Sequence, residues 1–438
     1  MGSSRAIVAV STVAVGLGTA PAFLFGFLGP VLQDDLGLSR TRIGLLVGLM
    51  FGLTGIGCLL AGRVTERIGA RWTVVLSTVL LVVALCAPLL SPGYPALVGC
   101  ALVSGVGYAL ANVGTNVSVT AALPVARHAV GLAVKTAGVP GAVAVTSFVV
   151  PGLGAAYGWQ PVLLWSVPVV VAVGVLAAAV LPDARGRITP ALDTTTADDP
   201  PPSPADLHER HIGATPLHER DVRADSGGRL PSGFWRFTLA ATLLIGGSQA
   251  IYSWAVPFLH EGAGATLPVA GVLTAVASLV ALAPMIGAAR LADRLGTTRR
   301  LPLAAALCAT LAVAEVVLAT GWGLAAAAVA LVVATGAQLG AVSLMHASVV
   351  AAAPHAVGRG SGAAMAGFYL GALFAAPLFG LLVDVTGGYP VAWVSGAVLT
   401  TAAAACFLWC RGVGRRPTAP DGPVTTGPAS PPTARPAH

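Results

Sequence analysis

Long, almost uncharged runs of apolar residues follow one another along most of the chain. The first covers about 7–32, and others cover 74–90, 96–123, 303–318 and 324–350. A helix of about 18 or more apolar residues is long enough to cross the hydrocarbon core of a membrane. Because backbone polar groups must bond to one another in lipid, several such runs predict a helical protein that crosses the membrane many times.

Polar and Gly/Pro-rich breaks divide the apolar sequence into twelve segments, six on each side of the polar stretch 182–233. The predicted spans are 6–29, 41–61, 72–90, 95–122, 131–155, 160–181, 234–257, 267–288, 301–319, 323–351, 359–382 and 389–410. The polar stretch has no apolar periodicity, which is typical of a flexible linker. We therefore expect an N-terminal six-helix bundle over 1–181, a cytoplasmic linker over 182–233, a C-terminal six-helix bundle over 234–410 and a disordered cytoplasmic tail over 411–438.

Composition narrows the class of protein. Of the 438 residues, 56% are hydrophobic and 9% are charged, whereas about a quarter of a soluble domain is charged. A soluble enzyme is therefore excluded. The cysteines lie inside apolar runs without a pairing or metal-ligand pattern, and no catalytic or ATP-binding signature occurs. We expect no enzyme activity, no cofactor and no metal.

Topology explains the net charge of +7. If the N-terminus is cytoplasmic, every arginine except Arg40 and Arg42 falls on the cytoplasmic side, where positive residues gather. The sequence thus predicts a multi-pass protein of the cytoplasmic membrane with both termini in the cytoplasm and no nucleic-acid partner. The acids Asp34, Glu261 and Asp384 fall at the opposite ends of the spans, where we expect them to anchor the membrane interface.

An internal repeat relates the two halves. Seven pairs of residues recur at one constant spacing: Pro30 and Pro257, Asp34 and Glu261, Gly37 and Gly264, Gly44 and Gly271, Arg63 and Arg290, Glu66 and Asp293, and Gly69 and Gly296. Two halves of six spans in the same orientation form parallel repeats about an axis along the membrane normal, with a binding site at their interface.

The loop between the second and third spans carries a recognisable motif, Gly62-Arg63-Val64-Thr65-Glu66-Arg67-Ile68-Gly69-Ala70-Arg71, and the second half repeats it from Ala289 to Gly296. This motif, its duplication and the topology resemble the major facilitator superfamily (MFS). The resemblance implies an all-α membrane protein with twelve transmembrane helices in two parallel-repeat bundles. It also implies a secondary transporter that works by alternating access. The fourth span lacks the arginine that many proton-coupled members carry there, and Glu66 replaces the usual Asp.

The motif residues are the candidate gate. Spans five and eleven begin at the cytoplasmic face, where their N-termini present partial positive charge. Glu66 can dock near Gly358-Arg359, and Asp293 near Val130-Gly131, so that the cytoplasmic side is held shut. The gating candidates are Arg63, Glu66, Arg67, Gly69, Arg290, Asp293, Arg294 and Gly296. The alternative is that these arginines only fix topology.

Intramembrane polar residues are the candidate substrate contacts, because they are costly in lipid. Lys135 is the chain's single lysine, about one turn into span five, where it can face a central cavity and pair with an anion, or snorkel to the interface. Tyr108, Asn112 and Asn116 form a stripe on span four. Further candidates are Gln249, Tyr252, Gln338 and Tyr369. The resemblance implies that spans 1, 4, 7 and 10 line the pathway; interhelical hydrogen bonding is the alternative for each residue.

Proton coupling, if present, needs His346, Glu315, Lys135 or the substrate itself, because spans one, four and seven have no mid-membrane carboxylate. Gly48-x-x-x-Gly52 in span two and Gly367-x-x-x-Gly371 in span eleven permit close helix packing. In the fold that the chain resembles, these two helices meet across the halves.

Together these observations predict a monomeric secondary transporter whose partners are a small solute, possible coupling protons and the lipid bilayer. An organic anion attracted by Lys135 is the expected substrate. Efflux of a hydrophobic drug or secondary metabolite is the first alternative, favoured by the sparse charge of the cavity. A non-transporting membrane sensor that signals through the linker is a further alternative from a different class.

Overall fold

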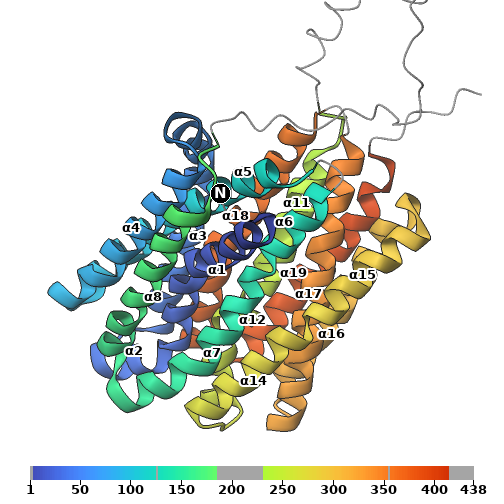
Figure 1. Cartoon of the computed structure of the whole chain (residues 1–438). Helices are drawn as coiled ribbons and strands as arrows, with labels where there is room; N and C mark the ends of the chain where they lie inside the picture. Colours follow the sequence, from blue (N-terminus) through green and yellow to red (C-terminus); the bar gives the residue numbers. More distant parts are fainter. Residues whose placement is uncertain (1–2, 125–126, 185–229, 354–355, 414–438) are drawn as a thin grey trace, which may run out of the picture.

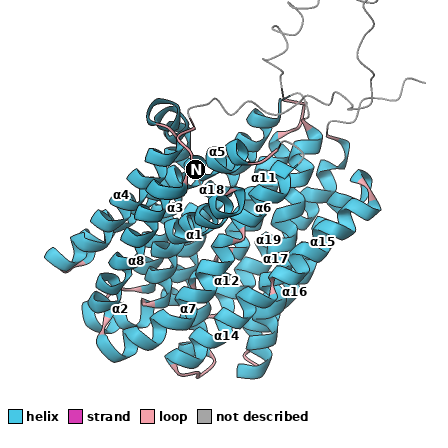
Figure 2. Cartoon of the chain, viewed as in Figure 1, coloured by secondary structure: helices cyan, strands magenta, loops and turns pink. Residues whose placement is uncertain are grey.

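The computed structural model describes residues 3–124, 127–184, 230–353 and 356–413. Within these ranges the chain is helical and contains no strand (Figure 2). Among the described residues, eleven helices are long and apolar enough to cross a membrane, and one bent helix pair can supply a twelfth span. The predicted all-helical, multi-pass architecture is confirmed.

The helices form two bundles that lie side by side (Figure 1). The first bundle consists of α1 (Ser4–Phe27), α2 (Gly29–Leu36), α3 (Arg40–Ile68), α4 (Ala70–Leu90), α5 (Tyr94–Ala122), α6 (His128–Thr136), α7 (Gly138–Tyr157) and α8 (Trp159–Val180). The second consists of α11 (Trp235–Ser248), α12 (Ala250–Ser253), α13 (Ala255–Pro257), the π-helix η3 (Phe258–Gly262), α14 (Leu267–Val280), α15 (Leu282–Leu295), α16 (Thr297–Thr320), α17 (Leu324–Ala352), α18 (Val357–Thr386), α19 (Pro390–Trp409) and the 3₁₀ turn η5 (Cys410–Gly412).

Two opposite faces of the molecule are named here by their loops. The linker face carries the start of α1 and the turns at Gly69 and Gly296. The distal face carries the turns at Gly37, Gly264 and Gly387. Each of these glycines has a positive φ, which a residue with a side chain rarely adopts, so each can end one helix and reverse the chain within a few residues.

The repeat seen in the sequence is visible in the breaks of spans 1 and 7. Pro30 and Pro257 cannot donate a backbone hydrogen bond to the carbonyl four residues earlier, so each span is interrupted just before its proline. The first span therefore ends as two helices, α1 and α2. The seventh is divided among α11, α12, α13 and η3, with a bend of 55°. A Cβ on Gly26 would collide with the carbonyl oxygen of Ser253, so the equivalent turns of the two repeats touch each other.

Two pairs of spans pack against each other at the interface between the bundles. Spans 2 and 11 meet as α3 and α18, and spans 5 and 8 meet as α7 and α14. Gly48 and Gly52 of α3 lie against Leu373 of α18, which confirms the predicted contact for this motif. Gly367 and Gly371 instead lie against α11 within the second bundle, where they contact the backbone of Thr238 and Thr242. The prediction that spans two and eleven meet across the halves is confirmed, while the second motif permits close packing within its own bundle.

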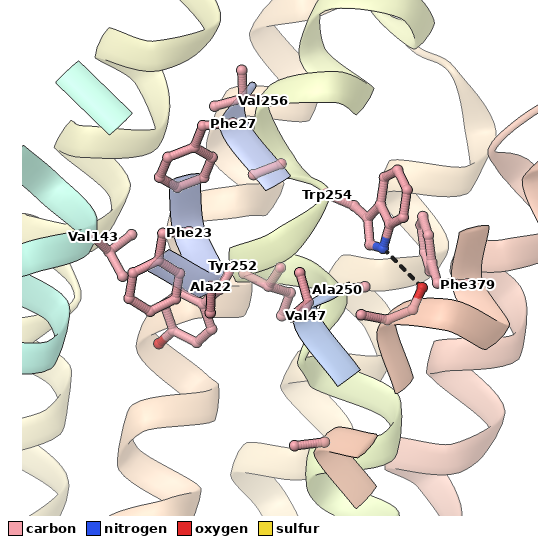
Figure 3. Packing of buried hydrophobic residues seen from close by; sticks show 14 of the residues in the cluster. Ala22, Phe23, Phe27, Val47, Val143, Ala250, Tyr252, Trp254, Val256 and Phe379 are labelled. Atoms are coloured by element: carbon pink, nitrogen blue, oxygen red, sulfur yellow. Dashed lines mark hydrogen bonds between the residues drawn. The ribbon is translucent and has the colours of Figure 1, made fainter. Parts of the chain in front are cut away.

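The core between the bundles is aromatic toward the distal face. Phe23 of α1 lies 6.3 Å from Tyr252 of α12 between ring centroids (Figure 3). The Trp254 indole stacks on Phe379 at 5.8 Å, and its Nε1 donates a hydrogen bond of 3.2 Å to the Ala376 carbonyl. These rings fix the bent span 7 against its neighbours.

Candidate substrate site and gates

Lys135 owes its position to a break in span 5. Pro140 cannot donate to the carbonyl of Thr136, so α6 ends at that residue and α7 begins at Gly138. A Cβ on Gly138 would collide with the carbonyl oxygen of Thr12, so the junction lies directly against α1. Lys135 occupies the last turn before this junction and is 2% exposed.

The Lys135 ammonium is held by two side-chain amides. Its Nζ donates to Asn112 Oδ1 at 2.8 Å and to Asn116 Oδ1 at 2.8 Å, so the polar stripe expected on span four does face span five. Both acceptors are neutral. Among the described side chains the ion pairs lie elsewhere, so no carboxylate of this part of the chain neutralises Lys135.

Two tyrosines extend this cluster across the bundle interface. Tyr108 lies one turn from Asn112 and contacts Phe51 edge-on at 6.4 Å. Tyr369 of α18 is 6% exposed and lies beside Asn112, Cys58 and Tyr108. A Cβ on Gly55 would come within 2.7 Å of the Tyr369 Cβ, so the tyrosine reaches the first bundle over a glycine of α3.

The remaining substrate candidates lie on the second bundle, and all three are buried: Gln249 (5% exposed), Tyr252 (8%) and Gln338 (3%). Gln249 and Tyr252 occupy the broken part of span 7. The Tyr252 hydroxyl and Gln338 Oε1 have no hydrogen-bond partner among the described residues. Buried polar atoms are normally bonded, so these two atoms are available to a ligand. None of the hydrogen bonds between described side chains joins these three residues to the Lys135 cluster.

The distal face carries a network that sequence reasoning did not find. Arg40 of α3 forms ion pairs with Glu261 at 2.5 Å and with Asp384 at 3.7 Å, both in the second bundle. Asp384 also accepts from the backbone N–H and the hydroxyl of Thr41, at 2.8 and 2.7 Å. The Tyr389 hydroxyl donates to Glu261 at 2.8 Å, and burial together with that carboxylate raises the pKa of Tyr389.

Glu261 and Asp384 were expected to anchor the membrane interface, but they join the two bundles instead. The signal for this network in the sequence was Arg40, one of the two arginines that do not fall on the cytoplasmic side. The distal ends of spans 1 and 7 are correspondingly closed, since every residue of 18–32 and of 247–259 is buried.

The signature loops of the linker face do not meet a described partner across the bundles. Arg63, Glu66 and Arg67 are exposed, as are Arg290 and Arg294. Gly69 (φ 86°) and Gly296 (φ 77°) link consecutive helices through a single residue, which gives the signature glycines a conformational reason. The side chain of Asp293 lies outside the described part, so the predicted gate at this face stays a prediction.

The two proton-coupling candidates occupy different environments. His346 of α17 is exposed, and its Nε2 lies 3.3 Å from the sulfur of Met365 on α18. Glu315 of α16 is 0% exposed, and its Oε2 accepts a hydrogen bond of 2.8 Å from Thr400 of α19. Neither belongs to the Lys135 cluster.

A helical membrane protein of two bundles with buried polar side chains has the fold of a solute transporter. The Major Facilitator Superfamily matches residues 8–365, so the chain belongs to that family. The family consists of membrane transporters, as the sequence motif had indicated.

Solved transporters share the whole fold. A bacterial homologue of the human lysosomal transporter Spinster, in an inward-facing and unoccupied conformation, superposes with a TM-score of 0.71 at 15% identity, over 95% of this chain and 99% of that one. The xylose transporter XylE from E. coli, inward open, superposes with a TM-score of 0.69 at 16% identity, over 92% and 96% of the two chains.

Sequence relatives match over a short stretch. Probable polyol transporters 3 and 6 of Arabidopsis thaliana are 34% and 35% identical over 80 and 81 residues. These stretches cover 18% of this chain and only 16% of each relative. The match therefore supports membership of a transporter family and leaves the solute to be argued from the site.

Proposed function

We propose that this protein moves a small organic anion across the cytoplasmic membrane by alternating access, as a monomer. The linker face is cytoplasmic, because the described arginines of the exposed loops gather there and only Arg40 and Arg42 lie at the distal face. Substrate enters or leaves between the bundles, where the buried polar residues of spans 4, 5, 7, 10 and 11 lie.

The buried Lys135 is the main support for an anionic substrate. The Lys135 side chain is 2% exposed and its ammonium has two neutral acceptors, so a buried positive charge here is stabilised by an anionic partner. An anionic group that approaches Asn112 and Asn116 can take over the third ammonium proton or displace an amide. The resulting charge-assisted hydrogen bond contributes about 1.5–3 kcal/mol.

A neutral polyol or sugar is the second candidate, since amide and hydroxyl groups line the rest of the site and the short sequence match is to polyol transporters. Xylonate and xylitol separate the two ideas, because they share a five-carbon hydroxylated chain and differ in one carboxylate. Purified protein in liposomes is assayed by counterflow with each labelled solute, and with a lipophilic cation as the probe for drug efflux.

We expect xylonate counterflow to exceed that of xylitol, and Lys135→Gln to lower the xylonate rate by about tenfold or more, as the loss of one charge-assisted hydrogen bond implies. Arg127→Gln is the matched control, because it removes an exposed charge from the same stretch of chain and should change little. Equal loss in both variants, or counterflow of xylitol or the lipophilic cation alone, contradicts the anion proposal.

A further inference from the structure

Glu315 is a buried acid that the substrate site does not use. It lies five residues before the distal end of α16 and is 0% exposed. Thr400 of α19 donates to its Oε2, and its Oε1 has no hydrogen-bond partner among the described residues. Such a position is unusual for a carboxylate, which normally accepts several hydrogen bonds when it is buried.

The charges around Glu315 do not compensate it. On its own helix the neighbouring titratable group is Cys308, and the residues that face it from α19, Thr400 and Gly396, are neutral. The titratable residue of α17 is His346, toward the linker end. The charged residues of α15 and η5 likewise lie near the linker end of α16. An unpaired carboxylate costs several kcal/mol inside a protein, whereas a carboxylic acid does not.

A cavity of about 290 Å³ lies at the distal face near this acid, and its lining includes Leu318 and Ala319 of α16. These residues follow Glu315 by three and four positions, so they cover the same side of the helix one turn nearer the surface. The same cavity is also lined by Arg40, Glu261 and Tyr389 of the distal network. It therefore touches both that network and the helical turn next to Glu315.

The same acid is also connected to the bend in span 7. A Cβ on Gly247 of α11 would come within 2.6 Å of the Thr400 methyl group and 2.7 Å of the Gly396 carbonyl oxygen. Thr400 thus touches both Glu315 and the turn that precedes Gln249. It is therefore a packing connection between Glu315 and the helical turn next to the broken part of span 7, where Gln249 and Tyr252 lie.

We propose that Glu315 is a proton-binding site, loaded from the distal face through the cavity at Leu318 and Ala319, and that Thr400 couples its protonation to the bend in span 7. The step is a simple protonation, in which the carboxylate takes one proton from water and becomes a carboxylic acid. The acid is the form that tolerates the closed, buried surroundings described above. The role of Glu315 in coupling rests on the proposed transport function, but the proton-binding site itself does not depend on it.

Infrared difference spectroscopy of the purified protein tests the binding site without any substrate. Titration with acid should produce the C=O stretch of a protonated carboxyl group in an apolar environment, and transfer to heavy water should shift that band. Glu315→Gln should remove the band, whereas Asp34→Asn, which changes an exposed acid on α2, should retain it. A band that persists in Glu315→Gln overturns the proposal.

The route is tested by obstruction of the cavity. Ala319→Phe fills the space above Glu315 and should slow the deuterium shift of the band by about tenfold. Val316→Phe places the same bulk on the exposed side of the same helix and should leave the rate unchanged. An equal rate in both variants contradicts access through this cavity, and this comparison does not require Glu315 itself to be replaced.

Coupling is tested in liposomes with xylonate or xylitol, whichever the protein exchanges. Glu315→Gln should keep counterflow within about twofold of the original rate but lose the stimulation of uptake by a proton gradient. Thr400→Val should weaken that stimulation, and Thr400→Ser should restore it. Full stimulation in Glu315→Gln overturns the coupling. Absence of counterflow in the unmodified protein would instead refute the proposed transport function, while the infrared result would still decide the proton site.

Discussion

The distal and linker faces are built from repeated loops, yet they are held in different ways. At the distal face Arg40 joins Glu261 and Asp384 across the bundles, and the ends of spans 1 and 7 are buried on all sides. At the linker face the signature residues Arg63 and Glu66 are exposed. This state is therefore closed at the distal face.

The difference arises from a departure from the repeat. Asp34 and Glu261 are equivalent positions, but the position equivalent to Arg40 in the second half is Leu267, so a symmetric partner for Asp34 does not exist. The backbones differ as well. The chain after Pro257 forms the π-helix that carries Glu261, whereas α2 stays α-helical up to its cap at Gly37. A duplicated sequence has thus produced a one-sided lock.

Loss of Arg40 should break this asymmetry most strongly. Arg40→Ala leaves Glu261 and Asp384, both in the second bundle, without their cation from the first bundle. We expect the equilibrium to shift toward a distal-open state by at least about tenfold, since each charge-assisted bond contributes about 1.5–3 kcal/mol. Inter-bundle distances between spin labels placed at the distal ends would measure the shift.

Arg42→Ala is the matched control for this prediction. Arg42 is also a distal arginine, but it lies over the Tyr94 ring at 5.6 Å within the first bundle, so its loss should not change the distances between bundles. A similar opening in both variants would mean that general positive charge, rather than the network, closes the face.

Replacement of the signature glycine Gly69 tests how much the turn at the linker face contributes to the stability of the fold. Gly69 has φ 86° and ψ 158°, a conformation that is essentially restricted to glycine, so Gly69→Ala should destabilise the fold by about 1–3 kcal/mol. The midpoint of thermal unfolding in detergent would measure this. Gly62→Ala, at a helical and open position of the same loop motif, should be neutral or slightly stabilising; comparable losses would show that the turn is not strained.

Replacement of Glu66 should have the smallest effect of these substitutions, and it tests the linker face in the comparison of the two faces. Since it is exposed in the distal-closed state, Glu66→Gln should leave the population of that state unchanged. If Glu66 docks on the start of span eleven in the opposite state, its loss should slow transport by about two- to fivefold, as expected for one charge at a helix terminus. Glu66→Asp should retain the original rate, and a Gln variant with unaltered turnover would argue against the gate.

Part of the site could be predicted because local spacing determines it. The stripe of Tyr108, Asn112 and Asn116 follows from helical periodicity, whereas the hydrogen bonds of Asn112 and Asn116 with Lys135 became visible only in the structure. The contact of Tyr369 with this cluster, and the packing of Gly367 on α11, depend on how helices distant in sequence are rotated about their axes. Nothing local fixes that rotation.

By itself the sequence determined the membrane class, the number and order of spans, the parallel repeat and the family, because apolar length, glycine and proline positions and charge asymmetry act locally along the chain. Only the tertiary structure decided that Arg40 locks the distal face, that Lys135 is neutralised by no described acid, and that Glu315 lies below a distal cavity. Each of these depends on which side chains from different bundles come within a few ångströms, and a chain can reach several such arrangements while it keeps the same spans.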